Sequence, residues 1–243
     1  MSTDLRFRRV LLKMSGEVLK GNTPSGIEPE AVVAAAQRLK QLTDLGTELA
    51  LVIGAGNLFR GQTGCREGMN RSCADQMGML ATVMNALAMR DALEACGVRA
   101  EVLSALPIPG VVQGFDYRVA NQLLAGGTVV LFAAGTGHPF FTTDTTAALR
   151  ACEIKADAVL KGTQVDGIYS ADPKRYPDAV RFPQISYSEA LARRLKVMDS
   201  TAFSLCMDND IPIVVFNFSQ AGVLADVVKG DLSQATLVCS EPR

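Results

Sequence analysis

Residues 10–21, VLLKMSGEVLKG, decide the fold, because an apolar run there ends in a charge and then in small residues. Residues 10–12 have the continuous hydrophobicity of a strand that is covered on both faces. Lys13 interrupts the run, and Ser15 and Gly16 follow where a strand gives way to a turn. One interpretation is an edge-strand lysine that reaches water. The other is a lysine at the rim of a sheet that meets phosphate oxygens, while small residues let backbone N–H groups approach the same anion.

Continuous apolar runs recur along the chain and are predicted to form buried strands, at residues 9–14, 48–54, 100–105, 128–135, 156–162, 211–218 and 235–240. The stretch between the first two runs is predicted to be a helix, with Pro29 near its start and Gly46 just past its end. Alternating strands and helices predict the α/β class, a three-layer αβα sandwich around a mainly parallel sheet. No Pro-, Gly- or Ser-rich linker divides the chain, so we expect a single domain over residues 1–243.

The composition is that of an ordinary globular protein, with 243 residues, 48% of them hydrophobic and 20% charged. A formal charge of -1 argues against nucleic-acid binding through bulk charge. No apolar run reaches the ~20 residues of a membrane span, and the N-terminus lacks the apolar core of a signal peptide. Six scattered cysteines predict neither a zinc site nor a disulfide framework. We therefore expect a cytoplasmic protein with reduced thiols.

The longest helical stretch, residues 75–97, is apolar on nearly every side. Its apolar side chains are Met77, Leu80, Met84 and Leu87 on one face and Met79, Val83, Ala86 and Met89 on another. Such a helix must be buried, either in its own core or against another copy of the chain. Methionine-rich faces suit adaptable packing, which favours a subunit interface.

Glycine-rich and polar segments follow four of the predicted strands, at residues 13–16, 54–61, 135–144 and 161–173. Ligands bind at the carboxyl ends of strands in such sheets, so these four loops predict one shared crevice. Residues 54–61 begin like a dinucleotide-binding GxGxxG, but position 59 is Phe and no helix clearly follows. The alternative is a flexible backbone cradle in which Arg60 supplies a planar cation for phosphate, or else lies on the surface.

The third and fourth of these loops leave similar choices open. Thr142, Thr143 or Asp144 is expected to cap the helix that follows, and the free N–H groups of that helix also make an anion site. His138, the only histidine, is interpreted as a loop residue rather than a catalytic base, because no nucleophile motif accompanies it. Tyr169 lies in a turn-rich segment and could equally give an adenine a flat surface.

Cationic loops, glycine turns and a few carboxylates together indicate phosphoryl transfer, which needs mainly positioning and charge neutralisation. The chain has no GxxxxGK[ST] motif and no protein-kinase HRD or DFG set. Its motifs LLKMSGE, VIGAGNLFRG, GMNR, AAGTGHPFFTTD, LKGTQVDGIYSADP and LKVMD instead resemble, in this order and spacing, the bacterial uridylate kinase branch of the amino acid kinase family. The resemblance covers residues 8–240.

The resemblance implies phosphorylation of UMP to UDP from ATP carrying Mg2+, by direct in-line transfer, in pyrimidine nucleotide biosynthesis. It implies that the N-terminal half binds UMP and the C-terminal half binds ATP. It also implies a homohexamer built from dimers, with residues 75–96 as the dimer face, activated by GTP and inhibited by UTP. Neither nucleic acid nor membrane is an implied partner.

Three sets of site residues follow from the motif positions. The implied catalytic residues are Lys13, Arg60 and Asp144. The implied ATP-binding residues are Lys13, Met14, Ser15, Gly16, Gly56, Arg60, Thr163, Tyr169 and Asp172. The implied UMP-binding residues are Ala55, Asp75, Thr136, Gly137, His138, Pro139, Phe140, Phe141, Thr142 and Thr143. No metal ligand is implied, and the roles of Lys161 and Asp199, near the phosphates, stay open.

Some positions depart from the family pattern. Ala55 stands where glycine is usual, and Glu101 and Thr128 stand where two arginines of the GTP site are usual. GTP activation is therefore left open. Two rival hypotheses also stand beside UMP phosphorylation: the same fold acting on another acceptor such as glutamate or aspartate, and a nucleotide- or oxyanion-binding protein without catalysis.

Overall fold

The computed structural model describes residues 5–59, 68–173, 175–193, 195 and 198–240. Its centre is a sheet of nine strands in the order β4-β3-β5-β2-β1-β6-β10-β11-β9. In chain order the strands are β1 (Arg9–Met14), β2 (Glu48–Ile53), β3 (Ala100–Ser104), β4 (Gln113–Gly114), β5 (Val129–Ala133), β6 (Ala158–Thr163), β9 (Gln184–Ser186), β10 (Ile213–Asn217) and β11 (Ala235–Cys239). Only the β10–β11 pair is antiparallel within this described sheet, so the mainly parallel prediction is confirmed.

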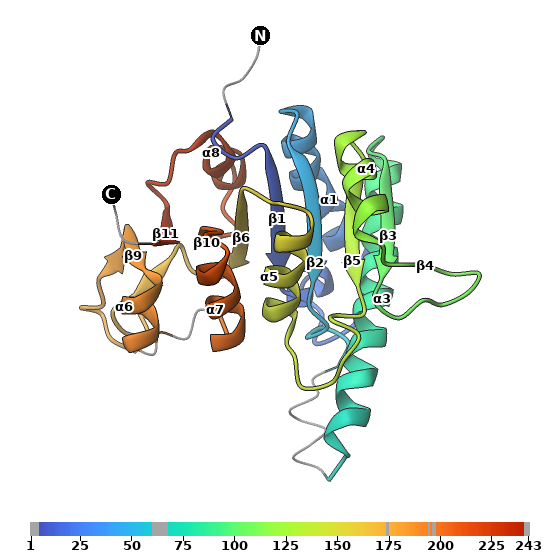
Figure 1. Cartoon of the computed structure of the whole chain (residues 1–243), viewed down its shortest axis with the longest axis horizontal. Coiled ribbons are helices and arrows are strands. Elements are labelled where there is room, and N and C mark those ends of the chain that lie inside the picture. The colour runs from blue at the N-terminus through green and yellow to red at the C-terminus, as the bar shows by residue number, and fades with distance from the viewer. Residues whose placement is uncertain (1–4, 60–67, 174, 194, 196–197, 241–243) are drawn as a thin grey trace.

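Helices cover both faces of the sheet, which gives the three predicted layers (Figure 1). One face packs against α1 (Pro29–Asp44), α3 (Arg71–Ala95), α8 (Val223–Lys229) and the short 3-10 helix η1 (Gly16–Lys20). The other face packs against α4 (Tyr117–Ala125), α5 (Thr143–Glu153), α6 (Tyr187–Ala192) and α7 (Ser200–Asp208). Each layer buries its own apolar cluster against the sheet.

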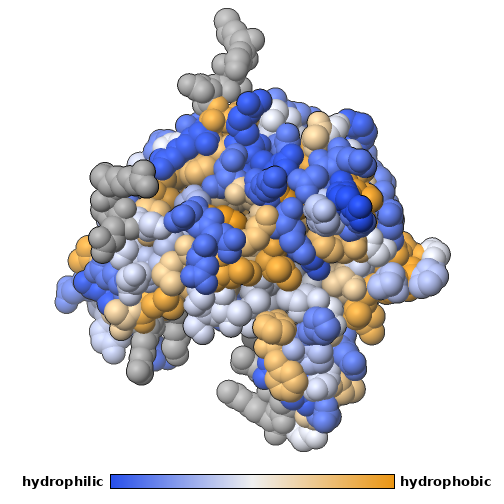
Figure 2. All heavy atoms as spheres, viewed as in Figure 1, coloured by the Kyte–Doolittle hydropathy of each residue, from blue (hydrophilic) through white to orange (hydrophobic). Residues whose placement is uncertain are grey.

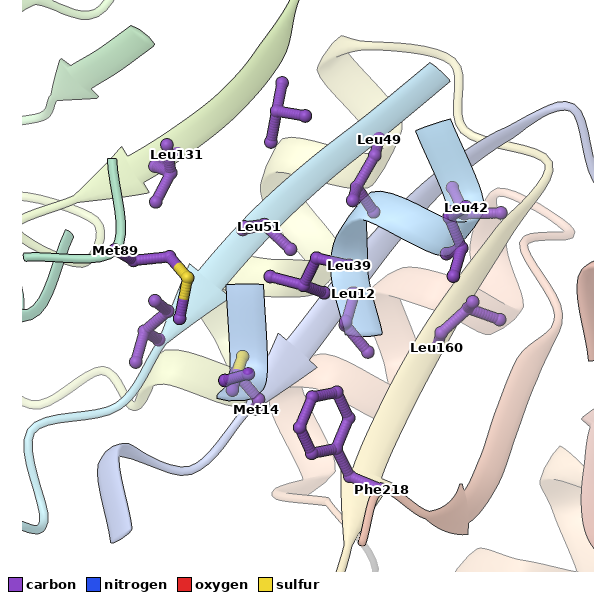
Figure 3. Close-up of a cluster of buried hydrophobic side chains, with 14 of the residues drawn as sticks. Leu12, Met14, Leu39, Leu42, Leu49, Leu51, Met89, Leu131, Leu160 and Phe218 are labelled. Atoms are coloured by element: carbon purple, nitrogen blue, oxygen red, sulfur yellow. The ribbon is translucent and has the colours of Figure 1, made fainter. Parts of the chain in front are cut away.

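The alternation of side chains along β1 decides where Lys13 points. Leu12 and Met14 lie in the cluster on the α1 side, where Figure 3 shows them close to Leu39. Leu11 lies in the cluster on the α5 side. Because residues two apart share a face, Lys13 points with Leu11 toward α5.

The predicted boundaries are close to those observed. Each predicted apolar run contains a strand, and the helix between the first two runs is α1, which begins at Pro29. Gly46 follows it with a left-handed φ of 84°. The short strands β4 and β9 and the hairpin of β7 (Ile168–Tyr169) with β8 (Arg181–Phe182) were not predicted, because strands of two or three residues carry too little periodicity.

Helix α3 begins earlier than predicted, at Arg71 rather than 75, because the Asn70 side chain accepts the Ser72 N–H at 2.9 Å and caps it. Its inner face is buried, as the own-core alternative required. The other face stays exposed in the single chain: Met77, Leu80 and Met84 are 40%, 50% and 54% exposed. Within the described part of the chain, no helix has both the length and the hydrophobicity to span a membrane.

Candidate functional site

Two lysines lie side by side at the carboxyl edge of the sheet. Lys13 of β1 pairs directly with Lys161 of β6 in the parallel register. Lys161 shares the α5-side face of β6 with Val159, two residues before it. Both ammonium groups therefore approach the start of α5, and like charges this close need a counter-ion.

Asp144, in the first turn of α5, supplies that counter-ion. Its Oδ1 lies 2.7 Å from Lys13 Nζ, and its Oδ2 lies 2.6 Å from Lys161 Nζ. The Lys161 contact is a directed hydrogen bond; the Lys13 contact is an ion pair, whose geometry leaves Oδ1 without a directed hydrogen bond. The side chains of Lys13, Lys161 and Asp144 are 14%, 12% and 14% exposed.

This triad shifts the ionisation of two members. Burial would raise the pKa of Asp144, but Lys13 and then Lys161 outweigh it, so the pKa lies below its ordinary value. Burial lowers the pKa of Lys161, Asp144 opposes that effect, and Lys13 adds to it, with a lowered pKa as the result. Asp144 is thus held as an anion, while burial is the main cause of the lowered pKa of Lys161.

The start of α5 is anchored to α7. Thr142 is the cap of α5, since its Oγ1 accepts the Asp144 N–H at 3.0 Å. The Thr142 hydroxyl also donates to Asp199, and the Thr145 hydroxyl lies 3.0 Å from both Asp199 oxygens. Asp199 caps α7 by accepting the Ala202 N–H at 2.9 Å. Asp199 therefore positions the end of α5 that carries Asp144.

The loops after β1 and β2 are packed tightly together. Gly54 N–H donates to Met14 O at 2.9 Å. A Cβ on Gly16 would lie 2.2 Å from Asn57 Oδ1 and 2.3 Å from Gly54 O, which no real side chain tolerates. Gly16 is thus required by close backbone approach, as at phosphate-binding turns. Ser15 caps the η1 turn by accepting the Glu17 N–H at 3.3 Å.

Two of the predicted ATP-binding residues, Met14 and Arg60, have no side chain that the structure places at the loops. The Met14 side chain is fully buried on the α1 side, so only its main chain faces the loops. Arg60, a predicted catalytic and ATP-binding residue, lies outside the described residues. A Cβ on Gly54 would lie 3.5 Å from Thr143 Oγ1, so the β2 loop also reaches the start of α5.

The loop between β5 and α5, which holds most of the predicted UMP-binding residues, lies along the N-terminal half of α3 (Figure 1). Asp75 Oδ2 accepts the Phe140 N–H at 2.8 Å and the Arg71 Nε–H at 2.7 Å. Phe140 and Phe141 are exposed. Figure 2 shows hydrophobic residues among polar ones at the lower end of the molecule, where the N-terminal half of α3 projects beyond the sheet. His138 lies in this loop, as predicted, and is exposed.

Two cavities open beside the lysine pair and share Lys161 and Thr163. One, of about 680 Å³, is lined by the three residues predicted for the ATP nucleoside, Thr163, Tyr169 and Asp172. The Tyr169 hydroxyl donates to Asp166 Oδ1 at 2.6 Å, which orients its ring. The other cavity, of about 1090 Å³, is lined by Lys13, Ser15 and residues of α1. Five of the predicted ATP-binding residues therefore line these two neighbouring cavities: Lys13, Ser15, Thr163, Tyr169 and Asp172.

The arrangement is suited to binding and neutralising phosphate groups. Four neighbouring strands, β5, β2, β1 and β6, end at this edge, which places the described parts of their loops on the same side of the sheet. Lys161, whose role the sequence left open, is a full member of the charged triad. The sequence did contain a pattern that indicates this position for Lys161, since it is a lysine near the end of an apolar run, as Lys13 is. The buried polar residues Thr82 and Asn85 gave no such signal.

The amino acid kinase family model matches residues 8–217. The chain is 54% identical over 230 residues to a uridylate kinase of Paramagnetospirillum magneticum, covering 95% of this chain and 96% of that protein. It is 54% identical over 233 residues to a uridylate kinase of Pseudoalteromonas atlantica, covering 96% of this chain and 94% of the relative.

Solved structures agree with these relatives. The UMP kinase from Bacillus anthracis superposes with a TM-score of 0.93 at 33% identity, over 97% of both chains. The UMP kinase from Ureaplasma parvum superposes with a TM-score of 0.90 at 36% identity, over 97% of this chain and 100% of that one. The chain therefore belongs to the amino acid kinase family.

Proposed function

We propose that this chain is a UMP kinase, which transfers the γ-phosphate of ATP to UMP and so forms UDP and ADP reversibly. The supporting observation is the Lys13–Asp144–Lys161 triad at the carboxyl edge of the sheet, between the loops predicted for the two nucleotides. The uridylate kinase relatives and UMP kinase structures support the choice of UMP as acceptor. The reaction would serve pyrimidine nucleotide biosynthesis.

The triad gives this reaction its electrostatic environment. The acceptor phosphate of UMP is already an anion, so the transfer needs no general base. As the γ-phosphoryl group passes in line between the nucleotides, Lys13 and Lys161 stabilise its charge. Asp144 keeps the two ammonium groups a fixed distance apart without contacting the phosphoryl group itself. Asp199, through Thr142 and Thr145, keeps Asp144 in place.

The two nucleotides would occupy different halves of the cleft. UMP would lie against Ala55, Asp75 and the loop before α5, in the N-terminal half. The ATP phosphates would lie near Ser15, Gly16 and Gly56, and the nucleoside would occupy the 680 Å³ cavity beside Tyr169. Arg60 is proposed to contact both phosphate chains, as the family motif implies.

Mg2+ is expected to enter with ATP. Both oxygens of Asp144 already face ammonium groups, at 2.7 and 2.6 Å, so this carboxylate is not free as a metal ligand. Mg2+ prefers oxygen ligands and is commonly held through substrate phosphates, which fits a cleft lined by lysines and backbone amides. When bound, the ion would add positive charge on the ATP phosphates.

Assembly, location and regulation are also proposals. The exposed methionine-rich face of α3 supports a dimer, and a homohexamer built from such dimers is the predicted assembly. The five cysteines that the structure describes are free thiols, which supports a cytoplasmic location. Glu101 and Thr128 lie at the amino ends of β3 and β5, on the opposite edge from the cleft. Activation by GTP and inhibition by UTP are predictions that the family resemblance implies.

A panel of acceptors tests the proposal directly. Purified protein with ATP and Mg2+ should release ADP with UMP and form UDP, but not with glutamate, aspartate or carbamate. ADP release with an amino acid instead would favour the same fold acting on another acceptor. Saturable ATP binding without ADP release from any acceptor would favour a binding protein.

A further inference from the structure

The inner face of α3 carries two polar side chains, Thr82 and Asn85, that are 4% and 0% exposed. They lie three residues apart, so they occupy neighbouring turns on the same face of the helix. Buried polar groups are costly unless they are hydrogen-bonded. Each of these two side chains also makes a hydrogen bond outside the helix, to the backbone at the end of a different strand.

Thr82 holds the end of β5. Its Oγ1 accepts the Ala134 N–H at 2.8 Å and donates to Met79 O at 2.7 Å. Ala134 is fully buried and has a left-handed φ of 60°, a conformation that is strained for a residue with a Cβ. Ala134 is the first residue of the loop that carries the proposed UMP contacts, so Thr82 stabilises the strained turn that aims this loop.

Asn85 holds the end of β2. Its Nδ2 donates to Gly54 O at 2.8 Å and to Asn57 Oδ1 at 2.8 Å, and Asn57 Nδ2 returns a hydrogen bond to Asn85 Oδ1 at 3.0 Å. Asn57 also donates to Gly26 O at 2.9 Å. The reciprocal amide pair therefore ties α3 to the loops after both β1 and β2, directly beside Gly54.

We propose that Thr82 and Asn85 are positioning residues for the UMP half of the site. Neither side chain contacts the proposed nucleotides. Together they hold the ends of β5 and β2, from which the two proposed UMP-binding segments, the loop before α5 and Ala55, extend. Asp75, earlier on the same helix, binds Phe140 of the first loop, so α3 holds that loop at both ends. The inference rests on the proposed function.

The isosteric variant Thr82→Val removes the hydroxyl and keeps the volume. A buried hydrogen bond contributes a factor of about five to ten, so the KM for UMP should rise by about that factor while the KM for ATP stays close to wild type. Thr82→Ser keeps the hydroxyl and should restore the KM for UMP. Thr47→Val is the matched control, because the buried Thr47 hydroxyl, at the opposite end of β2, has no hydrogen-bond partner among the described residues. It should leave both constants unchanged.

Asn85→Ser provides a second variant if Thr82→Val does not fold. It shortens the side chain, adds no bulk, and should also raise the KM for UMP. A KM for UMP unchanged from wild type in either folded variant, or equal rises for both nucleotides in Thr82→Val, would overturn the inference while leaving the proposed function intact. Absence of UDP formation by the wild-type protein would instead overturn the proposed function and this inference with it.

Discussion

Lys13 and Lys161 occupy directly paired positions on β1 and β6, and one carboxylate, Asp144, faces both of their ammonium groups. Neighbouring parallel strands bring their side chains close together, so two lysines in register would repel each other without a shared anion. The arrangement places two cations around one carboxylate at the rim of the sheet. Cations in such a position stabilise the charge of a transferring phosphoryl group.

Removing one of these cations should slow the chemical step. We expect Lys13→Ala to lower kcat for UDP formation by about a hundredfold to a thousandfold, the usual loss when one charge-stabilising group is deleted from an active site. A coupled assay of ADP release measures it. Lys40→Ala, in an exposed i,i+4 pair with Asp44 on α1, is the control and should turn over normally. Near-normal turnover by Lys13→Ala would refute the role assigned to Lys13.

The Asp144 carboxylate should make stability depend on acid pH. Its pKa is lowered in the folded chain from the ordinary 3.8, so its contribution is fully present above that value and is lost as pH falls through the folded pKa. Asp144→Asn should destabilise the protein by about 3 kcal/mol at neutral pH. It should also lose less stability than wild type between neutral pH and the acid region.

Chemical denaturation across that pH range measures the difference. Asp44→Asn, which breaks an exposed pair on α1, serves as the control and should follow the wild-type profile. Parallel pH profiles for wild type and Asp144→Asn would contradict the assigned ionisation of Asp144.

Gly16 should tolerate no side chain. Gly16→Ala places a Cβ 2.2 Å from Asn57 Oδ1 and 2.3 Å from Gly54 O, so overpacking should cost about 1–3 kcal/mol and displace the β1 and β2 loops. The melting temperature and UDP formation should both fall. Gly78→Ala, in α3 where no atom lies within 4 Å of the position that the new Cβ would take, should stabilise the helix by about 0.5–1 kcal/mol. Equal melting temperatures for the two variants would count against the close packing.

The exposed face of α3 should mediate assembly. Met84→Glu places a charge on a face where Met77, Leu80 and Met84 are exposed, and charges are depleted in the core of subunit interfaces. The variant should shift to smaller species in light scattering coupled to size-exclusion chromatography. Val180→Glu, at an exposed hydrophobic residue away from α3, should keep the wild-type mass. A wild-type mass for Met84→Glu would remove this face from the interface.

The hydroxyl of Tyr169 should matter for ATP and not for UMP. Tyr169→Phe removes the hydrogen bond to Asp166, which holds the ring beside the 680 Å³ cavity. We expect the KM for ATP to rise about threefold to tenfold, as for loss of one hydrogen bond, with the KM for UMP unchanged. Initial-rate measurements with each nucleotide varied in turn decide it. A selective rise in the KM for UMP would reverse the assignment of the two halves.

Much of the architecture was readable from local patterns. The continuous apolar runs located the longer strands, because a strand that is buried on both faces is apolar at nearly every position. The alternation of these strands with helices predicted the parallel three-layer arrangement. Lys13, Ser15 and Gly16 stood out because a charge and small residues at a strand end conflict with the surrounding hydrophobicity. The helix caps at Asn70 and Thr142 are local signals of the same kind, and Thr142 was among the predicted caps.

The sequence by itself determined which strand ends carry polar loops, and therefore where a phosphate site would form. Only the tertiary structure decided that Lys161 lies beside Lys13 and that Asp144 forms an ion pair with each of them. It also decided that Thr82 and Asn85 make hydrogen bonds to the ends of β5 and β2. These contacts join residues 17 to 148 positions apart, from Lys161 with Asp144 to Lys13 with Lys161. Strand order and register set such distances, and neither quantity is encoded in any short stretch of the chain.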